Sequence, residues 1–284
     1  MAVDLHTHTT FSDGSLTPYE LVDTAKAYKL TAIAITDHDE IGANAIAMDY
    51  AGAFPLDVIP GVEFSIDIEL AGTAHLHLLG LFLDVAHSRL MEVLNDLRNA
   101  RKERIDTILK KLNNLGLNLK QEELDSITGE GSAGRPHIAQ LLLRNNVVTS
   151  VWEAFNKYLS KDRVAYVPKK KLKLQDAIDL IHDAKGLAIL AHPISLKHKI
   201  YKETEAFLRE LKYIGLDGVE AYYSTHSKNF TSFLVNAAKR NNLLISGGSD
   251  FHGINKPDTD LGRGKGNLEV PDQVYFDLKD AHST

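Results

Sequence analysis

The segment Val3-Asp4-Leu5-His6-Thr7-His8 combines a short apolar alternation with two histidines spaced two residues apart. In a β-strand, residues i and i+2 point to the same side, so both imidazoles can contact one cation. A helix start follows: Thr17 can serve as N-cap, Pro18 suits the first helical position, and Glu20 completes a capping box. A buried strand followed by a polar loop and a helix is the repeating unit of mostly parallel α/β sheets.

The same alternation continues along most of the chain. Helix-period patterns predict helices at 17–29, 41–54, 172–185, 203–213 and 228–241. Apolar or alternating runs predict strands at 3–8, 31–36, 57–68, 74–82, 187–192, 218–223 and 243–248. We therefore expect a mostly parallel sheet of seven strands, of the kind that closes into a (β/α) barrel other than the standard eightfold one.

This rhythm is interrupted between about residues 88 and 163, where only helical patterns occur. A glycine-rich stretch at 129–134 divides them, just before Arg135. We expect a barrel formed by residues 1–98 and 168–284, with residues 99–167 inserted as a helical subdomain that contributes to substrate binding. The insert has eleven Lys/Arg against eight Asp/Glu, whereas the rest of the chain is acidic. A mildly basic insert on an acidic body suits an anionic substrate bound over cations.

The composition excludes several classes of protein. The 284 residues are 44% hydrophobic and 25% charged, as in an ordinary soluble domain, and no apolar run is long enough to span a bilayer. The N-terminus lacks the features of a signal peptide, and the absence of cysteine fits the cytoplasm. The absence of cysteine also restricts any metal site to nitrogen and oxygen ligands. A net charge of −6 argues against a surface built for bulk nucleic-acid binding.

Six histidines and three carboxylates fall at or near the ends of the predicted strands. Because the carboxyl ends of parallel strands share one side of a sheet, these groups can converge. Unpaired, such a concentration of buried charge would cost several kcal/mol per group, and bound cations remove that cost. The expected ligands are His6, His8, Asp13, His38, Glu63, His77, His192, Asp250 and His252. His75 has the same strand parity as His77 and competes with it for one position.

At these residues the chain resembles the polymerase-and-histidinol-phosphatase (PHP) family of metal-dependent phosphoesterases. The matching motifs run in the family's order from residue 4 to residue 252. The resemblance implies a distorted (β/α)7 barrel and three divalent cations, manganese, iron or zinc. It places His6, His8, Glu63 and Asp250 on the first cation. Glu63 then bridges to a second, also bound by His77 and His192, while Asp13, His38 and His252 hold a third.

The insert and its Gly134-Arg135-Pro136-His137 motif resemble a narrower subgroup of this family. That subgroup removes the 3′-phosphate of nucleoside 3′,5′-bisphosphates and can trim short 5′-phosphorylated RNA. We expect a hydroxide that bridges cations held by Glu63, His6, His8 and Asp250 to attack phosphorus in line. Arg135 is the expected phosphate clamp, because a guanidinium can bind two oxygens at once. The further substrate-binding candidates are Lys161, Arg163 and His226.

Three alternatives remain open from the sequence. A histidinol phosphatase would use the same ligands. A metal-dependent amidohydrolase also has His-x-His on its first strand, but typically with a modified lysine in the place of Glu63. A non-catalytic metal-binding module would keep the fold without the chemistry, although the ligand set here is complete. The expected partner is a small phosphorylated nucleotide or short RNA, with no membrane and no obligate protein partner.

Overall fold

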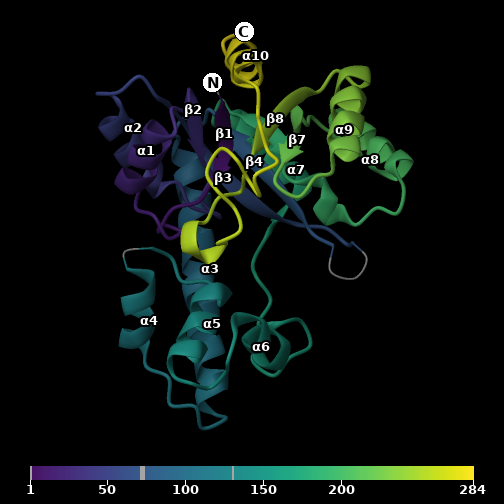
Figure 1. The fold of residues 1–284 in the computed structure, drawn as a ribbon. Helices are drawn as coiled ribbons and strands as arrows, with labels where there is room; N and C mark the ends of the chain where they lie inside the picture. Colours follow the sequence, from purple (N-terminus) through teal and green to yellow (C-terminus); the bar gives the residue numbers. More distant parts are fainter. Residues whose placement is uncertain (1, 71–73, 130) are drawn as a thin grey trace.

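The computed structural model describes residues 2–70, 74–129 and 131–284. Its sheet follows one path of seven strands, β1-β2-β3-β4-β6-β7-β8, which curves into a nearly closed barrel (Figure 1). The strands are β1 (Val3–Thr7), β2 (Ala32–Ile35), β3 (Asp57–Asp67), β4 (Leu76–Leu81), β6 (Leu187–Leu190), β7 (Gly218–Tyr223) and β8 (Leu244–Gly248). The segment after β8 joins β1, since the His8 amide donates to the Phe251 carbonyl at 2.9 Å. The expected distorted (β/α)7 barrel is confirmed.

One strand runs against the expected direction. β4 is antiparallel to both of its neighbours, β3 and β6, whereas the other pairs along the path are parallel. The start of β4, rather than its end, therefore lies beside the ends of the parallel strands. His77 still reaches the common face because it is the second residue of this reversed strand. We had expected His77 to lie at the carboxyl end of a parallel strand. That expectation was wrong, because β4 is antiparallel to its neighbours.

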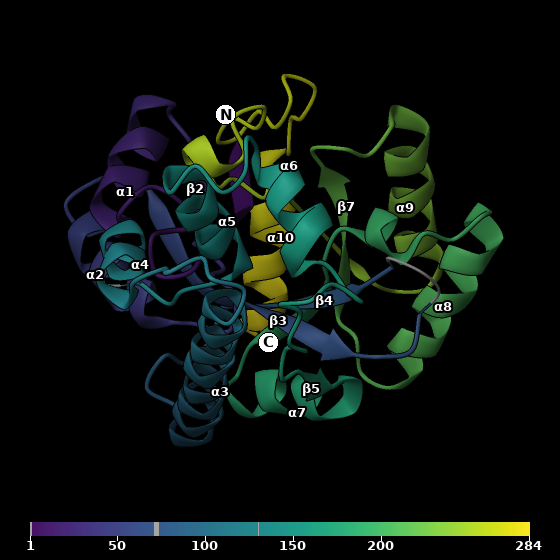
Figure 2. The same ribbon diagram turned by 90° about the horizontal axis from the view of Figure 1, so that it is seen from below.

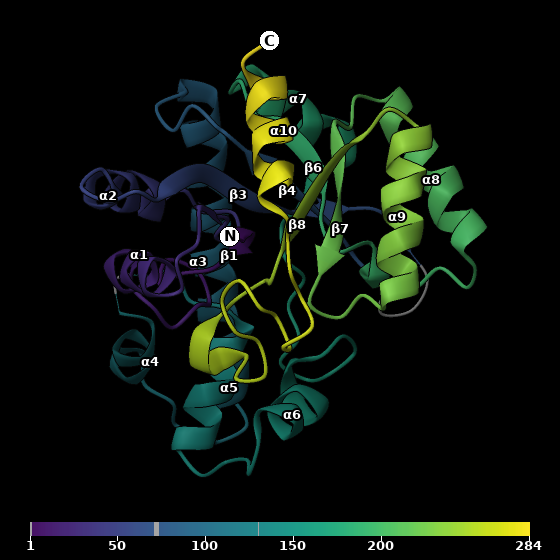
Figure 3. The ribbon, with the colours of Figure 1, turned by 45° about the horizontal axis from the view of Figure 1, so that its top comes forward.

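Helices cover the outside of the sheet and close one end of the barrel. The outer helices are α1 (Pro18–Ala27), α2 (Gly42–Ala51), α7 (Leu174–Asp183), α8 (Tyr201–Tyr213) and α9 (Lys228–Arg240). The last helix, α10 (Asp272–His282), packs at one end of the strands (Figure 3). Its Tyr275 and Leu278 share a core with Val3 and Leu5 of β1. The opposite end of the barrel is left for the polar strand ends.

The pattern at 172–185 was expected to be wholly helical. Leu172 and Lys173 instead form the short strand β5 beside β3, and α7 begins two residues later, at Leu174. The parallel register of Leu172 with Ile66 accounts for the difference, because a two-residue strand is too short to leave a period of its own.

The interrupted region forms a group of helices on the side of the barrel opposite α10 (Figures 1 and 2). It comprises α3 (Ser88–Asn113), α4 (Gln121–Thr128), α5 (Arg135–Arg144), α6 (Val151–Ala154) and the π-helical turn η1 (Phe155–Leu159). The helix α3 belongs to both regions. Its Leu90, Leu94 and Leu97 lie in the barrel core, while residues from Ile105 onward lie in a separate core with α4 and α5. The expected boundaries at 99 and 167 stay a prediction, and Glu130 lies outside the described residues.

Contacts within the insert and just after it join this region to the loops of the barrel. The Ser132 amide donates to the Phe11 carbonyl at 3.2 Å. Gly131 is pressed so closely on the Thr10 carbonyl that a Cβ atom there would overlap it. Just after the insert, the partly buried Lys169 amine contacts Asp39 at 2.5 Å and donates to the Ser65 hydroxyl at 2.7 Å. The insert is thus joined to the loops that follow β1 and β2. None of the described helices is long and apolar enough to cross a membrane.

Candidate metal centre

The nine expected ligands come together at the open end of the barrel. His6 and His8 lie on and just after β1, Glu63 on β3 and His77 on β4. The others belong to loops that leave β1, β2, β6 and β8. Most of these side chains are buried, and Asp13, His38 and His77 are partly exposed. Seven separate segments of the chain therefore place one ligand or two each around a single point.

Glu63 lies at the centre of this arrangement. Its Oε1 atom is 2.7 Å from His77 Nδ1 and 2.9 Å from His192 Nε2. Its Oε2 atom faces the other side, 3.4 Å from His6 Nε2, 3.3 Å from His8 Nε2 and 2.9 Å from His38 Nδ1. The two oxygens are directed at different sets of histidines, which is the geometry that a carboxylate shared by two cations requires.

The remaining ligands gather on either side of His8. On one side, Asp250 Oδ1 lies 3.2 Å from His8 Nε2, so His6, His8, Glu63 and Asp250 form one possible coordination group. On the other, His8 joins Asp13, His38 and His252, with His252 Nε2 at 3.2 Å from Asp13 Oδ1. The expected third group did not include His8, which the structure places between the two.

The hydrogen bonds of the cluster indicate that it is built for cations. Five of its buried atoms lack a hydrogen-bond partner among the described residues: His6 Nε2, His8 Nε2, Asp13 Oδ1, His38 Nδ1 and Glu63 Oε2. An unsatisfied buried polar atom costs about 1–3 kcal/mol. Because these atoms belong to ligating groups that face one another, divalent cations would satisfy all of them at once. The residues fit a polynuclear site.

The electrostatics of the cluster lead to the same conclusion. Burial opposes a proton on His8, but the close carboxylates of Asp250 and Glu63 outweigh it and raise the pKa of His8 to about 9. Burial would also raise the pKa of Glu63, yet the surrounding histidines, His38 first, hold it well below its ordinary value. The carboxylates therefore stay ionised and attract positive charge to the imidazole nitrogens. A cation and a proton compete for those nitrogens.

A second layer of side chains orients these ligands. Glu220 of β7 is fully buried and accepts from His6 Nδ1 at 2.9 Å, so His6 Nε2 is left to face the cluster. The same carboxylate accepts from the His192 amide. His252 Nδ1 likewise donates to the Asp250 carbonyl at 2.8 Å. Such partners fix the tautomer of a ligating histidine. The sequence analysis missed Glu220, for which the one signal was a glutamate within an apolar strand.

Comparison with known proteins identifies the family. The PHP domain model matches residues 4–212. The 5′-3′ exoribonuclease Rnm of Escherichia coli is 34% identical over 253 residues, covering 88% of this chain and 84% of the relative. The 3′,5′-nucleoside bisphosphate phosphatase of Chromobacterium violaceum is 30% identical over 263 residues, covering 92% and 90%. The chain belongs to the PHP family.

A solved structure agrees with this assignment. A Bifidobacterium adolescentis protein assigned as a metal-dependent phosphoesterase superposes with a TM-score of 0.84 at 26% identity, covering 97% of this chain and 94% of that protein. The predicted family and its class of enzyme, a metal-dependent phosphoesterase, are confirmed.

The sequence left open whether His75 or His77 is the ligand at the start of β4. His77 contacts Glu63 directly, whereas His75 is exposed one residue before the strand begins. His75 nevertheless lies within range of a group with His77 and His192, its ring centroid 5.0 Å from that of His77. His77 remains the expected ligand of the shared carboxylate's cation, and His75 lies beside it at the rim.

The four expected substrate-binding residues fall into different places. Arg135 lines a cavity of about 360 Å³ that opens beside His38 and His77. Lys161 and Arg163 are exposed, and Arg163 donates to Asn156 rather than facing the cluster. His226 is buried, with Nδ1 donating to the Ala221 carbonyl at 3.0 Å. Of the four, the structure brings only Arg135 to the site.

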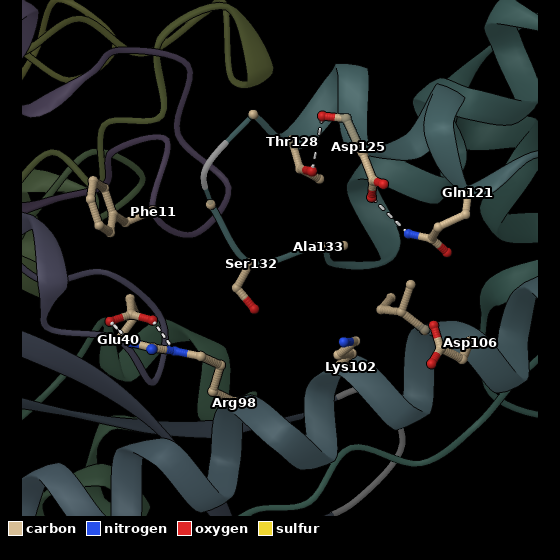
Figure 4. Close-up of a pocket in the computed structure, with 13 residues that line it drawn as sticks. Phe11, Glu40, Arg98, Lys102, Asp106, Gln121, Asp125, Thr128, Ser132 and Ala133 are labelled. Atoms are coloured by element: carbon tan, nitrogen blue, oxygen red, sulfur yellow. Dashed lines mark hydrogen bonds and ion pairs between the residues drawn. The ribbon is translucent and has the colours of Figure 1, made fainter.

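A second hollow, of about 630 Å³, lies between α3, α4 and the loop after β1 (Figure 4). It meets the Arg135 cavity at Ser132. It is lined by two cations, Arg98 and Lys102. Arg98 is bound through two nitrogens by Glu40, at 2.7 and 2.9 Å. Asp106 and Asp125 add negative charge on the insert side. This hollow therefore combines side chains of both charges.

Proposed function

We propose that this PHP phosphoesterase hydrolyses the ester at the 3′-oxygen of 5′-phosphorylated nucleotides, in nucleoside 3′,5′-bisphosphates and at the 5′ end of short RNA. One observation carries the proposal: the cavity beside the ligand cluster contains the cationic groups of Arg101, Arg104, Arg135, Lys169 and Lys171. Such a cavity provides a place for a second phosphate while the first lies at the cluster.

The cations of this cavity are held in position by the backbone of the insert. Arg135 donates to the Leu159 carbonyl at 3.1 Å, and Arg104 donates to the Val167 carbonyl at 2.9 Å. The Arg135 guanidinium also lies 5.6 Å from the ring of Phe155 and 5.8 Å from that of Tyr166. Burial lowers the pKa of Arg135, and a guanidinium remains charged in proteins even so. Aromatic rings beside a fixed guanidinium suit a nucleoside that carries a phosphate.

The two relatives act on substrates that share one arrangement. In a 3′,5′-bisphosphate and in 5′-phosphorylated RNA, the first nucleoside has a phosphate on its 5′-oxygen and a phosphoryl group on its 3′-oxygen. The basic cavity would bind the 5′-phosphate, and the cluster would bind the 3′-phosphoryl group. A histidinol phosphate has an ammonium group in place of the second phosphate, and the arginines of the cavity would repel it.

Three cations per chain would complete the site, held by His6, His8, Asp13, His38, Glu63, His77, His192, Asp250 and His252. When bound, manganese, iron or zinc ions would lower the pKa of water and neutralise the phosphoryl oxygens. The protein's own contribution is to hold Glu63 between the histidine groups, to direct Nε2 of His6 at the cluster through the Glu220 hydrogen bond to Nδ1, and to orient the ester with Arg135. A cytoplasmic location stays part of the proposal, since the chain has no cysteine.

A substrate panel tests the proposal. The protein, supplied with manganese, is incubated with adenosine 3′,5′-bisphosphate, adenosine 3′-monophosphate, histidinol phosphate and a 5′-phosphorylated tetranucleotide, and the products are separated by chromatography. We expect adenosine 5′-monophosphate from the bisphosphate and from an adenosine-initiated RNA. The 3′-monophosphate should react at least tenfold more slowly, because it leaves the basic cavity empty. Phosphate release from histidinol phosphate alone would contradict the proposal and leave the metal cluster intact.

A further inference from the structure

A groove, here called the outer groove, leads from the cluster on the side away from the basic cavity. The hollow above the cluster, about 260 Å³, shares His38, His75 and His77 with the basic cavity. It shares Tyr223, Thr225, Asp250 and Lys256 with a further hollow of about 240 Å³. This last hollow shares no lining residue with the basic cavity. The three hollows thus follow one another, with the ligand cluster in the middle.

We infer that this outer groove, lined by residues 223–225, 249–250, 256–259 and 265, binds the RNA that continues beyond the scissile phosphate, with Lys265 contacting its next phosphate. The inference rests on the proposed function, because it assumes that the first nucleotide occupies the basic cavity. The basic cavity then binds the nucleotide on the 5′ side of the scissile phosphate, and the outer groove binds the RNA on its 3′ side. A nucleoside bisphosphate would use only the basic side, and an RNA would use both.

The position of Lys265 depends on a tight glycine-rich loop. Asp260 and Gly264 exchange two backbone hydrogen bonds of 2.8 Å, which bring the loop back on itself. Gly264 has a φ of +55°, and a Cβ atom there would lie 2.6 Å from the Ser224 hydroxyl oxygen. Only glycine allows the loop to lie this closely on the end of β7. Lys265 is thereby held at the groove, beside the Ser224–Thr225 segment.

The chemistry of the groove suits a nucleic-acid backbone. The exposed Lys265 has no ion-pair partner within the described parts of the chain, so its charge is available to a ligand. Lys256 stands at the entrance, where it contacts Asp250 at 2.7 Å. Hydroxyl groups of Thr225 and Thr259 also line the groove, and Asp258 is the one carboxylate in it besides Asp250. Lysines and hydroxyls are the common donors to phosphate oxygens.

The reaction between the two grooves is hydrolysis of the phosphodiester that joins the first nucleotide to the second. Water adds its oxygen to phosphorus, the bond from phosphorus to the 3′-oxygen of the first nucleotide breaks, and that oxygen takes a proton. The products are a nucleoside 5′-monophosphate on the basic side and an RNA one nucleotide shorter, which keeps a 5′-phosphate, on the outer side. The outer groove therefore contacts only the diester's second substituent, which a bisphosphate lacks.

The test compares two substrates in two lysine variants. Lys265→Ala and Lys265→Glu are assayed in the metal-loaded protein with adenosine 3′,5′-bisphosphate and with a 5′-phosphorylated tetranucleotide. We expect kcat/KM for the RNA to fall about tenfold in Lys265→Ala and further in Lys265→Glu, as for the loss of one charged hydrogen bond. The bisphosphate should react within twofold of the wild-type rate. The salt dependence for RNA should become shallower by a slope of about 0.7, the value for one phosphate contact on a single strand.

Lys239→Ala is the matched control, since Lys239 is exposed near the end of α9, outside the groove. It should leave both substrates unchanged. Equal rates on RNA in wild type and both Lys265 variants would overturn the inference, as would a wild-type protein that hydrolyses the bisphosphate and no RNA. A protein that hydrolyses neither substrate would instead refute the proposed function, and the groove assignment with it.

Discussion

The barrel and the inserted helices meet at the ligand cluster, and they contribute different kinds of side chain. The barrel supplies all nine expected ligands, held on strands and on the loops that leave them. The insert supplies arginines and aromatic rings, such as Arg135 and Phe155, and none of the ligands. Each region also has a hydrophobic core of its own. The difference leads us to expect that the barrel carries the chemistry and that the insert takes part in the choice of substrate.

Glu63→Gln should have the largest effect, because it acts on the barrel's central ligand. Glutamine keeps the volume but loses the charge and one oxygen that face two sets of histidines. We expect at least a loss of about 10³-fold in kcat, which is about 4 kcal/mol, and fewer bound cations by mass spectrometry of the metals. The exposed Glu210→Gln on α8 serves as control and should behave as wild type. Normal metal content together with normal activity would remove Glu63 from the centre of the site.

Leu141→Ala tests whether the insert unfolds apart from the barrel. Leu141 is fully buried in the insert core, and its truncation should destabilise that core by about 2–5 kcal/mol. Hydrogen exchange should then quicken in α4 and α5 while the strands stay protected and the metal content stays unchanged. The matched change Leu278→Ala, in the core under α10, should quicken exchange in the strands instead. Uniform acceleration in both variants would show that the two regions form a single cooperative unit.

The free energy of unfolding at acid pH depends on the buried His226 of the barrel. Burial lowers the pKa of His226 to about 4, while an unfolded histidine titrates near 6.5. Above pH 6.5 both states are neutral. As the pH falls from 6.5 toward 4, the unfolded chain takes up the proton first, so the protein loses up to about 3 kcal/mol of stability from this group.

Urea unfolding of wild type and His226→Gln at pH 7, 6 and 5 measures this contribution. Glutamine can still donate to the Ala221 carbonyl, and it cannot titrate. The ligating histidines contribute equally to both proteins and cancel in the difference. The variant should therefore lose less stability than wild type between pH 7 and pH 5. Parallel curves for the two proteins would mean that the pKa of His226 is the same in the folded and unfolded states.

Arg135→Ala should show the insert's part in choosing the substrate. It removes a fixed guanidinium from the basic cavity and no ligand from the cluster. We expect kcat/KM for the bisphosphate to fall about 10–100-fold, the range for a charged hydrogen bond of roughly 1.5–3 kcal/mol, with unchanged metal content. Arg163→Ala, at an exposed arginine of the same insert, should have little effect. If both variants reacted at the wild-type rate, the cavity would have no role in binding.

The strands were predictable from sequence because alternation and short apolar runs occur wherever a strand is half or fully buried. The convergence of the nine expected ligands was predictable because most of them lie in motifs at or near strand ends. The direction of β4 was not, since the residue pattern of a strand is the same in both directions. Its reversal follows from the tight pairing of β3 with β4, in which Glu63 lies opposite Leu79.

The residues that support the site were harder to find because their partners are distant in sequence. The partly exposed Lys169 and the buried Asp39 form an ion pair across 130 positions. Arg101 and Arg104 occur on the polar-looking half of α3, where a solvated helix face would look the same. Lys161 and Arg163 were chosen for charge alone, and the fold places them on the exposed surface of the insert. Charge identifies a candidate, whereas the direction of a side chain depends on packing.

The helix α3 holds the insert rigidly against the barrel, which affects how the basic cavity binds a ligand. It is 26 residues long, about 39 Å at 1.5 Å per residue, and it contains neither glycine nor proline. One half is anchored in the barrel core and the other in the insert core, so bending between them would disturb both. The basic cavity is then preformed, and a nucleotide loses little free energy in ordering it. Stopped-flow binding should accordingly show a single association phase whose rate rises linearly with nucleotide concentration.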